Sequence, residues 1–500
     1  MKHTYYIRIL LVFSSLFTLW NVSNIAFAEE TFTVSRGVRQ IFLDDAGIAS
    51  MEGLVRVVHQ PDRYPNNPVL TPDTPWESRC QVYGTAYYDE ALGRFRMWYL
   101  TTPRDRGLKP LDMGTHERAP HTTLAAYAES EDGIHWIKPN LEIFPYDGDR
   151  QNNLLGFGRY NCDGISGLHE PSDRDPKRRW KAVYWDHGSG DWEVLDGKPY
   201  AKPGPFDGFY VAFSPDGIHW NSYKDNPVLR KYCDTNQNVV YDPNLKKYVA
   251  FSRFGFGRKL ARSESEDFLH WTEPQLVLEC DEQDGPNTQI YGAGVDLYES
   301  LYLAMIWMYR EGGDGKIDTQ LAVSRDGFHW TRVANRATWL ALGDDDSWEG
   351  GMVRSVERII RRGDTLYIYY CGVHGAHTGP MRETVERKYP TAIGLLTLRR
   401  DGFVSLQAEE SEGILLTQPF SLPEGNLYLN ANAESGSIST ALCDSNGEPI
   451  LGFEESQTIS GDTLQSAVKW KKEVPSELLG RQACLRISIR NADLYSYWWE

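Results

Sequence analysis

Cysteine is scarce in this 500-residue chain. Its seven cysteines are an odd number and include no C-x-x-C pair, so no disulfide framework can be read from their spacing. Buried thiols are the expected role for most of them, and one or two bridges remain open in an oxidising compartment. Helical periodicity is also hard to find after residue 30, which argues against a largely helical protein.

Basic residues are in deficit: 52 Lys and Arg stand against 69 Asp and Glu, a formal net charge of −17. Nucleic acids and anionic membranes both select basic surfaces, so the sequence predicts neither as a partner. Neutral or locally charged small ligands remain open, as does the oligomeric state.

No apolar run is long enough to span a bilayer. The N-terminus carries Lys2 and Arg8, an apolar run from Ile9 to Trp20 and an A-x-A site at residues 26–28. This order is typical of a secretory signal peptide, with a membrane anchor as the alternative. We expect a signal peptide at residues 1–28, whose removal takes away two positive charges (−17 − 2 = −19), and a secreted or periplasmic mature protein.

Aromatic residues, in contrast, are abundant. They make up 13% of the chain, with 16 Trp and 28 Tyr. Aromatic and β-branched side chains fit the half-buried surface of a sheet. The composition therefore predicts an all-β protein.

One seven-residue pattern recurs along the chain. "SEDGIHW" begins at Ser130, "SPDGIHW" at Ser214, "SEDFLHW" at Ser265 and "SRDGFHW" at Ser324, and "RRDGFVSL" places a degenerate fifth copy at Asp401. Asp-Gly suits a tight turn because Gly accepts positive φ and the Asp side chain bonds nearby amides. The Trp that follows offers a flat apolar surface. We expect the repeat to be scaffold, with its Trp residues packed between neighbouring units and its His residues structural.

Each copy follows apolar strands separated by Asp, Asn and Gly turns, as in "NVVYDPNLKKYVAFSRF" from Asn238. This alternation predicts a four-stranded antiparallel meander for each unit. Five such sheets around one axis form a five-bladed β-propeller, which leaves only short edges.

The domain boundaries follow from the repeat and from composition. We place an N-terminal arm at residues 29–65, which completes or brackets the propeller, and the propeller itself at 66–404. Composition shifts after Leu398, and residues 405–500 are typical of a β-sandwich. Packing against the propeller is its expected role, and an auxiliary or carbohydrate-binding role is the alternative.

These units, from "YPNNPVLTP" at Tyr64 through "IGLLTLRRDGF" at Ile393, resemble the five-bladed propeller glycosidases of glycoside hydrolase families 32, 43, 68 and 130. More specifically, the units resemble secreted bacterial proteins described as family 32-like or family 43-like hydrolases, and the sandwich looks like that of family 32 enzymes. The invertase-type W-M-N-D-P-N-G is absent, and E-C-P appears only as "ECD" at Glu279. No catalytic residue of family 32 is therefore carried over, since fold does not fix function.

The resemblance implies a funnel at one end of the central channel, where the innermost strand of each blade begins. One acidic residue can be named near each opening: Glu77, Glu170, Asp234, Asp284 and Glu349. Carboxylates that share a cavity repel one another, which pushes some pKa values upward. Glycoside hydrolysis needs this, because one carboxyl donates a proton while a second, ionised, attacks or activates water. A surface turn or cap is the alternative for each acid alone.

We expect Glu170, Asp234 and Glu349 to be catalytic, followed by Asp284. Glu170 precedes Pro171, similar to the Asp-Pro dipeptide that opens a blade in family 43 proteins. Asp234 precedes Thr-Asn-Gln, whose polar side chains can bind sugar hydroxyls. Glu349 lies between a Trp and two Gly residues, which combine a stacking surface with room for close backbone approach.

Further substrate contacts are expected from residues in or near the innermost strands. Arginines there can bind a carboxylate or sulfate of an acidic sugar, or form buried ion pairs instead. Aromatic rings can stack on a sugar, although core packing is the default for Trp307. The remaining expected substrate-binding residues are Glu77, Arg253, Arg258, Tyr291, Trp348 and Arg354.

His374 and His377 form an H-x-x-H near Cys371. A structural zinc site needs a fourth ligand at recognisable spacing, and none is visible. We therefore expect rim histidines that bind hydroxyls and no cofactor, while the resemblance leaves a channel calcium ion open.

The sequence thus predicts a secreted glycoside hydrolase, exo-acting on a terminal sugar of a plant or algal oligosaccharide or polysaccharide. A non-catalytic sugar-binding propeller is one alternative, which would not need converging acids. A glycoside phosphorylase is the other, and it would need a cluster of basic residues for phosphate.

Overall fold

The computed structural model describes residues 32–104, 123–158, 162–187, 207–378 and 389–500, and the backbone of four short strands between these ranges. Within them, every regular element is a β-strand except four short 3₁₀ turns, at Pro176–Arg178, Glu282–Asp284, Val333–Arg336 and Ser476–Leu478. The prediction of an all-β protein is confirmed. The described part contains no helix with the length and apolar character needed to cross a membrane. The expected signal peptide lies outside the described residues.

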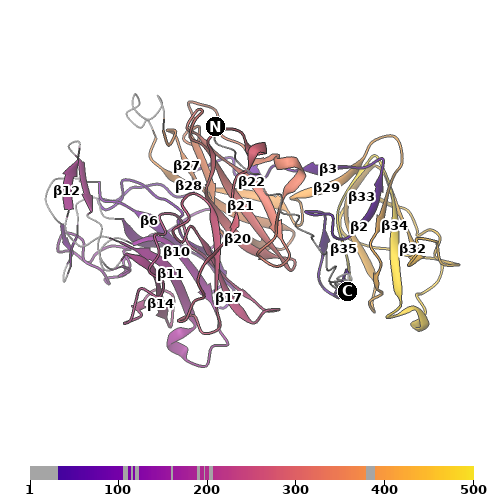
Figure 1. Ribbon diagram of the computed structural model, residues 1–500, viewed down its shortest axis with the longest axis horizontal. Helices are drawn as coiled ribbons and strands as arrows, with labels where there is room; N and C mark the ends of the chain where they lie inside the picture. Colours follow the sequence, from indigo (N-terminus) through magenta and orange to yellow (C-terminus); the bar gives the residue numbers. More distant parts are fainter. Residues whose placement is uncertain are drawn as a thin grey trace, which may run out of the picture.

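The chain forms a larger body of several sheets and a smaller body that holds the C-terminus (Figure 1). The larger body contains five antiparallel meanders, called here first to fifth in chain order. The first is β5 (Ala86–Asp89), β6 (Arg94–Thr101) and β9 (Leu124–Ser130). The second is β10 (Cys162–His169), β11 (Trp180–Asp186), β14 (Gly208–Ser214) and β15 (Asn221–Ser222). The third is β16 (Asn238–Asp242), β17 (Lys247–Ser252), β18 (Leu260–Ser265) and β19 (Gln275–Leu278).

The fourth and fifth meanders share one sheet. The fourth is β20 (Thr288–Tyr298), β21 (Leu301–Arg310) and β22 (Ile317–Ser324), with β23 (Trp330–Arg332) and β24 (Thr338–Leu340) both paired to β22. The fifth is β25 (Met352–Ser355), β26 (Ile360–Arg362), β27 (Thr365–Val373), β28 (Ala392–Arg399) and β4 (Asp62–Arg63). Two separate hairpins complete this body: β7 (Leu111–Met113) with β8 (His116–Arg118), and β12 (Trp192–Leu195) with β13 (Lys198–Ala201).

The first strands of the meanders follow one another in space as they do in the chain. β10 contacts β16, β16 contacts β20, and β20 contacts β25. β26, which continues from β25, contacts β5 of the first meander, and β10 contacts β6 of that same meander. The order of contacts therefore closes on itself, and the fifth meander lies against the first.

The repeated heptad forms a turn held by its own side chains. Asp216 Oδ1 accepts hydrogen bonds from the amides of Ile218 and His219, at 2.9 and 2.8 Å, and its Oδ2 lies 2.7 Å from His219 Nδ1. The Trp220 indole donates to the Gly217 carbonyl oxygen at 2.8 Å. The same bonds recur in the other three copies that end in His-Trp.

The Trp residues of the repeat pack across meander boundaries, as expected. Trp136 of the first meander contacts Tyr369 of the fifth, Trp271 contacts Phe209 of the second, and Trp330 contacts Phe251 of the third, with ring centroids 5.4–5.7 Å apart. Each of these turns thereby attaches its own meander to the preceding one.

The smaller body is one ten-stranded sheet built from both ends of the chain. β2 pairs with β30, β3 with β29, and β1 with β35. The long β32 pairs with β35 through its first half and with β34 through its second half, so it links two parts of the sheet. The expected N-terminal arm thus divides: β1 to β3 join this sheet, whereas β4 pairs with β28 in the fifth meander. The strands are β1 (Gln40–Ile41), β2 (Ile48–Glu52), β3 (Val55–Val58), β29 (Val404–Ala408), β30 (Gly413–Thr417), β31 (Phe420–Ser421), β32 (Leu427–Asp444), β33 (Ile459–Ala467), β34 (Gln482–Arg490) and β35 (Ala492–Trp499).

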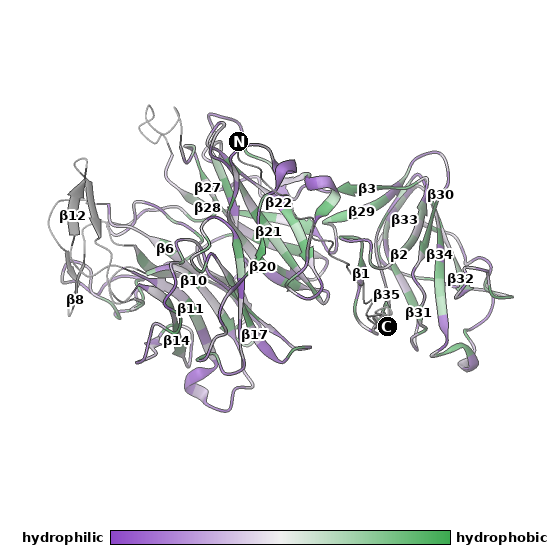
Figure 2. Cartoon of the chain, in the orientation of Figure 1, coloured by the Kyte–Doolittle hydropathy of each residue, from purple (hydrophilic) through white to green (hydrophobic). Residues whose placement is uncertain are grey.

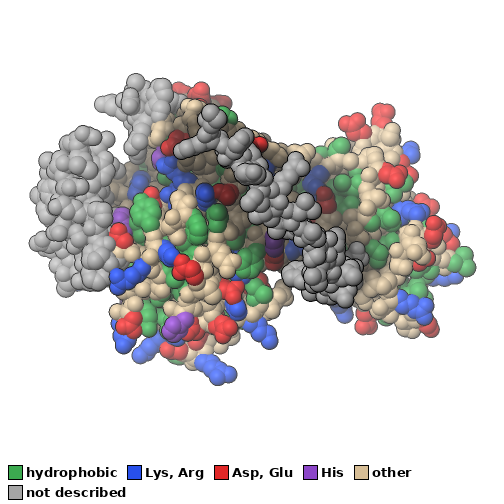
Figure 3. Space-filling view, in the orientation of Figure 1, with side chains coloured by type: hydrophobic (Ala, Val, Ile, Leu, Met, Phe, Trp, Pro, Cys, Tyr) green, Lys and Arg blue, Asp and Glu red, His purple; other side chains and the backbone are tan. Residues whose placement is uncertain are grey.

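Apolar side chains join the two bodies. One buried cluster includes Leu303 and Leu321 of the fourth meander together with Leu406, Leu415 and Leu485 of the smaller body. Figure 2 shows the apolar strands concentrated in the interior of both bodies. Six of the seven cysteines are buried thiols, which confirms the role expected for most of them. On the face in Figure 3, Lys and Arg side chains are interspersed with Asp and Glu.

Candidate functional site

Two aspartates lie where the first strands of the second and third meanders begin. Asp163 belongs to the start of β10, and Asp234 precedes β16. Between them, Gly164 adopts a φ of +59°, and a Cβ atom there would lie 2.5 Å from the Thr235 carbonyl oxygen. Glycine permits both this backbone conformation and this close approach. The starts of β10 and β16 are therefore in contact, which brings Asp163 beside the segment that carries Asp234.

Each of these aspartates has a nitrogen partner. His187 Nε2 lies 2.9 Å from Asp163 Oδ2, and Arg253 Nη1 lies 3.4 Å from Asp234 Oδ2. The Tyr232 hydroxyl donates to Asp234 Oδ2 at 3.2 Å. The side chain of Asp234 is 55% exposed and that of Asp163 is 20% exposed, so both can meet a ligand from solvent.

The electrostatics differ between the partners. Partial loss of solvation raises the pKa of Asp234, and the negative charge of Asp163 raises it further. Arg253 lowers the pKa, but the net pKa of Asp234 stays above its ordinary value. Burial lowers the pKa of His187, but the hydrogen bond and charge of Asp163 outweigh burial and raise it. The arrangement thus holds a proton on Asp234 to higher pH than usual, near a second carboxylate paired with imidazole.

A cluster of aromatic and guanidinium groups lies near the starts of β5, β20 and β25, the first strands of three other meanders. The Tyr83 ring stacks on Trp307 with centroids 5.4 Å apart, and its hydroxyl accepts a 2.5 Å hydrogen bond from Arg354. Arg253 lies 5.0 Å from the centroid of the Tyr291 ring and donates to the Tyr291 carbonyl oxygen at 2.6 Å. The charges of Arg253 and Arg354 both act on Tyr83, so the two guanidinium groups share one neighbourhood. We call these five residues the Tyr83 cluster.

The structure therefore brings together four residues expected from the sequence: Asp234, Arg253, Tyr291 and Arg354. Arg258 lies at the edge of the cluster, 5.4 Å from the Tyr291 ring centroid, and pairs with Glu311 at 3.2 Å.

Glu77 and Glu170 do not join this group. Glu77 is fully buried in the first meander, where Lys138 Nζ lies 2.6 Å from its carboxylate and Tyr99 donates to it at 2.5 Å. Glu170 directly follows the last residue of β10, at the opposite end of that strand from Asp163, and pairs with Lys181 at 2.8 Å. Both carboxylates have their charge compensated by a lysine of the scaffold.

Asp284 and Glu349 are also paired elsewhere. The side chain of Asp284 is 2% exposed and lies 3.0 Å from Arg332 and 2.8 Å from Arg336. Glu349 is 7% exposed and lies 2.9 Å from Arg63 of β4, the outermost strand of the fifth meander. Its neighbour Trp348 packs on Tyr370 of β27, with centroids 5.6 Å apart. The structure gives these groups ion pairs within the scaffold and does not bring them beside Asp234.

The two histidines after β27 have different surroundings. His374 Nδ1 lies 2.7 Å from the Ser347 carbonyl oxygen. The His377 ring contacts Tyr291 and Tyr309, each with centroids 4.9 Å apart, so this histidine borders the Tyr83 cluster. Within the described ranges, no three His, Cys, Asp or Glu side chains gather in a way that could hold a metal ion.

Asp163 and His187 were not among the residues expected from the sequence. A signal for Asp163 exists in the chain, because "NCDG" at Asn161 and "YCDT" at Tyr232 both place an aspartate after a cysteine at the opening of a first strand. Cys162 and Cys233 are both fully buried, which fixes each aspartate at the edge of the core. His187 directly follows β11, and no sequence pattern pairs it with Asp163.

Glu357 is a further residue that the sequence did not single out. It lies after β25, is 1% exposed, and accepts a hydrogen bond from the Thr85 hydroxyl of the first meander. Burial raises its pKa to about 7, although Arg358 and the bonds from Thr85 and Ser166 act in the opposite direction. A carboxyl group thus lies buried among the first, second and fifth meanders.

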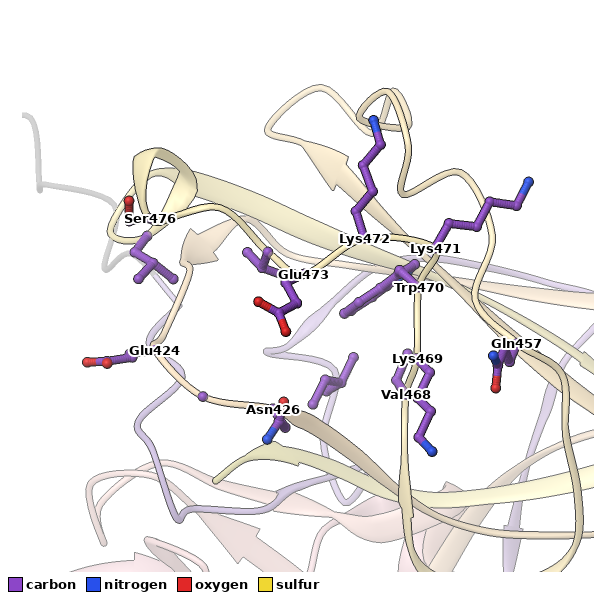
Figure 4. A pocket seen from close by; sticks show the side chains of 14 residues that line it. Glu424, Asn426, Gln457, Val468, Lys469, Trp470, Lys471, Lys472, Glu473 and Ser476 are labelled. Atoms are coloured by element: carbon purple, nitrogen blue, oxygen red, sulfur yellow. The ribbon is translucent and has the colours of Figure 1, made fainter.

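A cavity of about 620 Å³ opens in the smaller body, lined by residues of the segments 424–427 and 468–479 and by Gln457 (Figure 4). Lys471 and Lys472 extend away from Glu473 in this view, and Glu424 and Glu473 do not converge. The Trp470 indole N–H already donates to the Thr440 carbonyl oxygen at 2.9 Å. The cavity therefore differs from the starts of β10 and β16, where two aspartates lie on adjoining segments.

No protein-family model matches the chain. Cryptochrome DASH from Natronomonas pharaonis is 24% identical over 257 residues, which cover 45% of this chain and 51% of that protein. The chain thus spans about half the length of the curated relative that it matches.

Several solved structures are similar to the larger part of the chain. A glycosyl hydrolase from Bacteroides ovatus is 15% identical with a TM-score of 0.44, covering 69% of this chain and 94% of that one. The β-1,2-mannobiose phosphorylase from Listeria innocua is 13% identical with a TM-score of 0.42, covering 67% and 96%. The catalytic domain of a GH62 α-L-arabinofuranosidase from Coprinopsis cinerea is 14% identical with a TM-score of 0.40, covering 69% and 97%. All three of these similar proteins are named as enzymes that act on carbohydrates.

Proposed function

We propose that the protein is a glycoside hydrolase in which Asp234 is the proton donor and Asp163 is the base or the nucleophile. The observation that carries the proposal is the position of these two aspartates at the starts of adjoining strands, where burial and the charge of Asp163 raise the pKa of Asp234 and Asp163 pairs with His187. Glycoside hydrolysis requires two carboxyl groups in opposite protonation states.

The chemistry follows from those two states. Protonated Asp234 gives its proton to the glycosidic oxygen as the bond to the anomeric carbon breaks. Asp163 either takes a proton from the attacking water or attacks the anomeric carbon itself. The Tyr291 ring of the Tyr83 cluster, which is partly exposed, supplies a surface against which the sugar packs.

We propose that the larger body is a five-bladed β-propeller and that the smaller body is a β-sandwich. The propeller is supported by a closed order of contacts that runs from β10 through β16, β20 and β25, continues from β26 to β5, and returns from β6 to β10. In such a ring the first strands surround one axis and open at the same end. This explains why residues as distant in sequence as Tyr83 and Arg354 meet.

The setting in which the enzyme works is also part of the proposal. The charged, apolar and A-x-A segments of residues 1–28 support export, and we propose exo-action on a terminal sugar of a plant or algal glycan.

The test is a screen of the purified mature chain against plant and algal glycans, with product sugars identified. Asp234→Asn and Asp163→Asn are each expected to lower kcat by roughly 100-fold or more without changing the melting temperature, because each removes one of the two carboxyl groups. Asp364→Asn, in the exposed turn between β26 and β27, is the matched control and keeps full turnover. Full activity in both site variants would disprove the assignment.

The same screen separates the alternatives. A non-catalytic sugar-binding protein would bind a glycan without releasing product. A phosphorylase would release product only when inorganic phosphate is present, and that product would be a sugar phosphate.

A further inference from the structure

The Tyr83 cluster contains hydrogen-bond donors that have no acceptor. Arg253 and Arg354 are 4% and 5% exposed, yet the Nε atom of each is buried without a hydrogen-bond partner in the described structure. The indole Nε1 of the fully buried Trp307 is likewise without a partner there. Guanidinium and indole N–H groups donate and cannot accept. Because buried donors in folded proteins are nearly always satisfied, these three N–H groups are available to an acceptor that a ligand brings.

The charges in the cluster are also unbalanced. Arg354 contacts two neutral groups, the Tyr83 hydroxyl and, at 3.6 Å, the Cys371 Sγ atom. Burial raises the pKa of Tyr83 well above its ordinary value, so the phenol stays neutral and supplies no counter-charge. Arg253 has one carboxylate contact, to Asp234 at 3.4 Å. A buried charge without a counter-charge is costly, so Arg354 is the group that an anion would stabilise.

Other arginines near this end of the ring show the contrast. Arg258 pairs with Glu311 at 3.2 Å, and Arg310 pairs with Asp318 at 2.6 Å. The lack of a carboxylate partner is thus specific to Arg354 among these neighbours, and it occurs where Arg253 connects the cluster to Asp234.

We propose that the Tyr83 cluster is a subsite for an oxyanion substituent of the substrate sugar, a uronic acid carboxylate or a sulfate ester, and that the substrate is an acidic glycan. A guanidinium group binds such oxyanions through two parallel hydrogen bonds, and the Nε atom of Arg354 is available for one of them. The inference rests on the proposed function for one point only, namely that the sugar beside Asp234 is the one whose bond is cleaved.

The experiment measures binding, so it does not depend on turnover. Titration calorimetry of the full mature chain compares glucuronate, galacturonate and mannuronate with their neutral parent sugars, and a sulfated monosaccharide with its unsulfated form. At least one acidic sugar is expected to bind roughly tenfold or more tightly than its neutral counterpart, because a charged hydrogen-bond pair is gained. Preference for uronates or for sulfated sugars identifies which oxyanion the subsite takes.

Variants locate the effect. Arg354→Gln is expected to abolish the preference for the acidic sugar, and Arg354→Lys to retain part of it, since lysine keeps the charge but not the planar donors. Arg361→Gln, also in the fifth meander but paired with Glu299 at 2.9 Å, is the control and keeps the preference. Circular dichroism checks folding; if Arg354→Gln does not fold, the lysine variant and the comparison of sugars on the unmodified chain decide.

Three results would overturn the proposal: equal affinity for every acidic and neutral pair, a preference that survives in Arg354→Gln, or binding of inorganic phosphate or sulfate with no preference among the sugars. The last would indicate a phosphorylase. Turnover of neutral glycans without any acidic preference would remove this inference and leave the proposed hydrolase standing. A preference for acidic sugars without any turnover would remove the proposed hydrolase and leave the acidic-sugar subsite standing.

Discussion

The protonation of one residue, Glu357, makes the stability of the folded state depend on pH. Its carboxyl group is buried, and burial raises its pKa from 4.5 to about 7. Between these values the folded chain keeps a proton that the unfolded chain has released. The contribution of Glu357 to stability is therefore complete below pH 4.5 and is lost as the pH rises to about 7.

We predict that Glu357→Gln stabilises the folded state, relative to the unmodified chain, increasingly as the pH rises. Glutamine cannot ionise, and its carbonyl oxygen can still accept the hydrogen bond from Thr85. From pH 4.5 to pH 8, the free energy of unfolding of the variant relative to the unmodified chain should increase by about 3 kcal/mol. Urea unfolding at both pH values measures it, with Asp364→Asn as the exposed control. An unchanged difference between the two pH values would show that Glu357 does not hold its proton.

At this scale the sequence is informative where a residue's neighbours along the chain decide its surroundings. Asp234 is such a residue, because its place just before β16 follows from the residues next to it in the sequence. The pairing of Asp163 with His187 does not, because β10 and β11 must first align in register before the two side chains meet. Charge compensation is equally hidden: nothing near Glu349 in sequence indicates that its partner is Arg63.

At the scale of elements, the heptad turn shows how a short pattern specifies local structure. In three copies the fourth position is a glycine with φ between 75° and 79°. The copy at residues 265–271 has Phe268 at φ 69°, and its ring is buried against Tyr248 and Trp271 with centroids 5.0 and 5.6 Å away. Aromatic packing offsets the strained backbone there, so this copy keeps the turn without glycine.

We predict that Asp216→Ala lowers the free energy of unfolding by about 1–2 kcal/mol at neutral pH, because two backbone amides lose their acceptor. Asp216→Asn keeps one acceptor oxygen and should lose less. His219→Ala removes only a side chain that is 66% exposed and serves as the control. Chemical denaturation measures all three. A loss in His219→Ala as large as in Asp216→Ala would refute the role given to the amide bonds.

The pH dependence of this turn lies outside the neutral range. Burial raises the pKa of Asp216, but the amide and His219 bonds outweigh it and lower the pKa to about 2. The stability that these bonds contribute is therefore present above pH 3.8 and is lost only as the pH falls to about 2.

At the scale of the whole molecule, Asp401 joins parts of the chain that are far apart in sequence. Its carboxylate pairs with Arg39 of the N-terminal arm at 2.8 Å, and accepts hydrogen bonds from Tyr298 of β20 at 2.7 Å and Ser496 of β35 at 2.6 Å. Arg39 also lies 3.6 Å from the centroid of the Trp498 ring. This buried network holds the smaller body against the fourth meander.

We predict that Arg39→Ala lowers the free energy of unfolding by about 3–5 kcal/mol, because it leaves the Asp401 charge buried and unpaired. Arg325→Ala, which breaks an exposed pair with Asp44, is the matched control and should cost less than about 1 kcal/mol. Differential scanning calorimetry and denaturant unfolding compare the two. Similar losses in both variants would contradict the central role of Asp401.

The repeated heptad made the meanders of the larger body predictable, because each copy marks one turn at a fixed place in its unit. The division of the N-terminal arm was not predictable in this way. β1 to β3 are short, and their partners lie hundreds of residues away, so only the finished sheet determines which body they join. The position of the Tyr83 cluster has the same cause, since it depends on contacts among first strands that no local pattern records.

The pairing of β1 with β35 also sets an order in time. The amide of Gly37 donates to the carbonyl oxygen of Trp499 at 2.8 Å, and β1 pairs with a strand that is synthesised hundreds of residues later. The ribosome makes β1 to β3 well before β30 and β35 exist, and β1 and β2 cannot pair as they do in the folded protein until those later strands have been synthesised. The meanders can fold as they emerge, whereas the smaller body, and with it the Arg39–Asp401 contact, forms only after β35 has been synthesised.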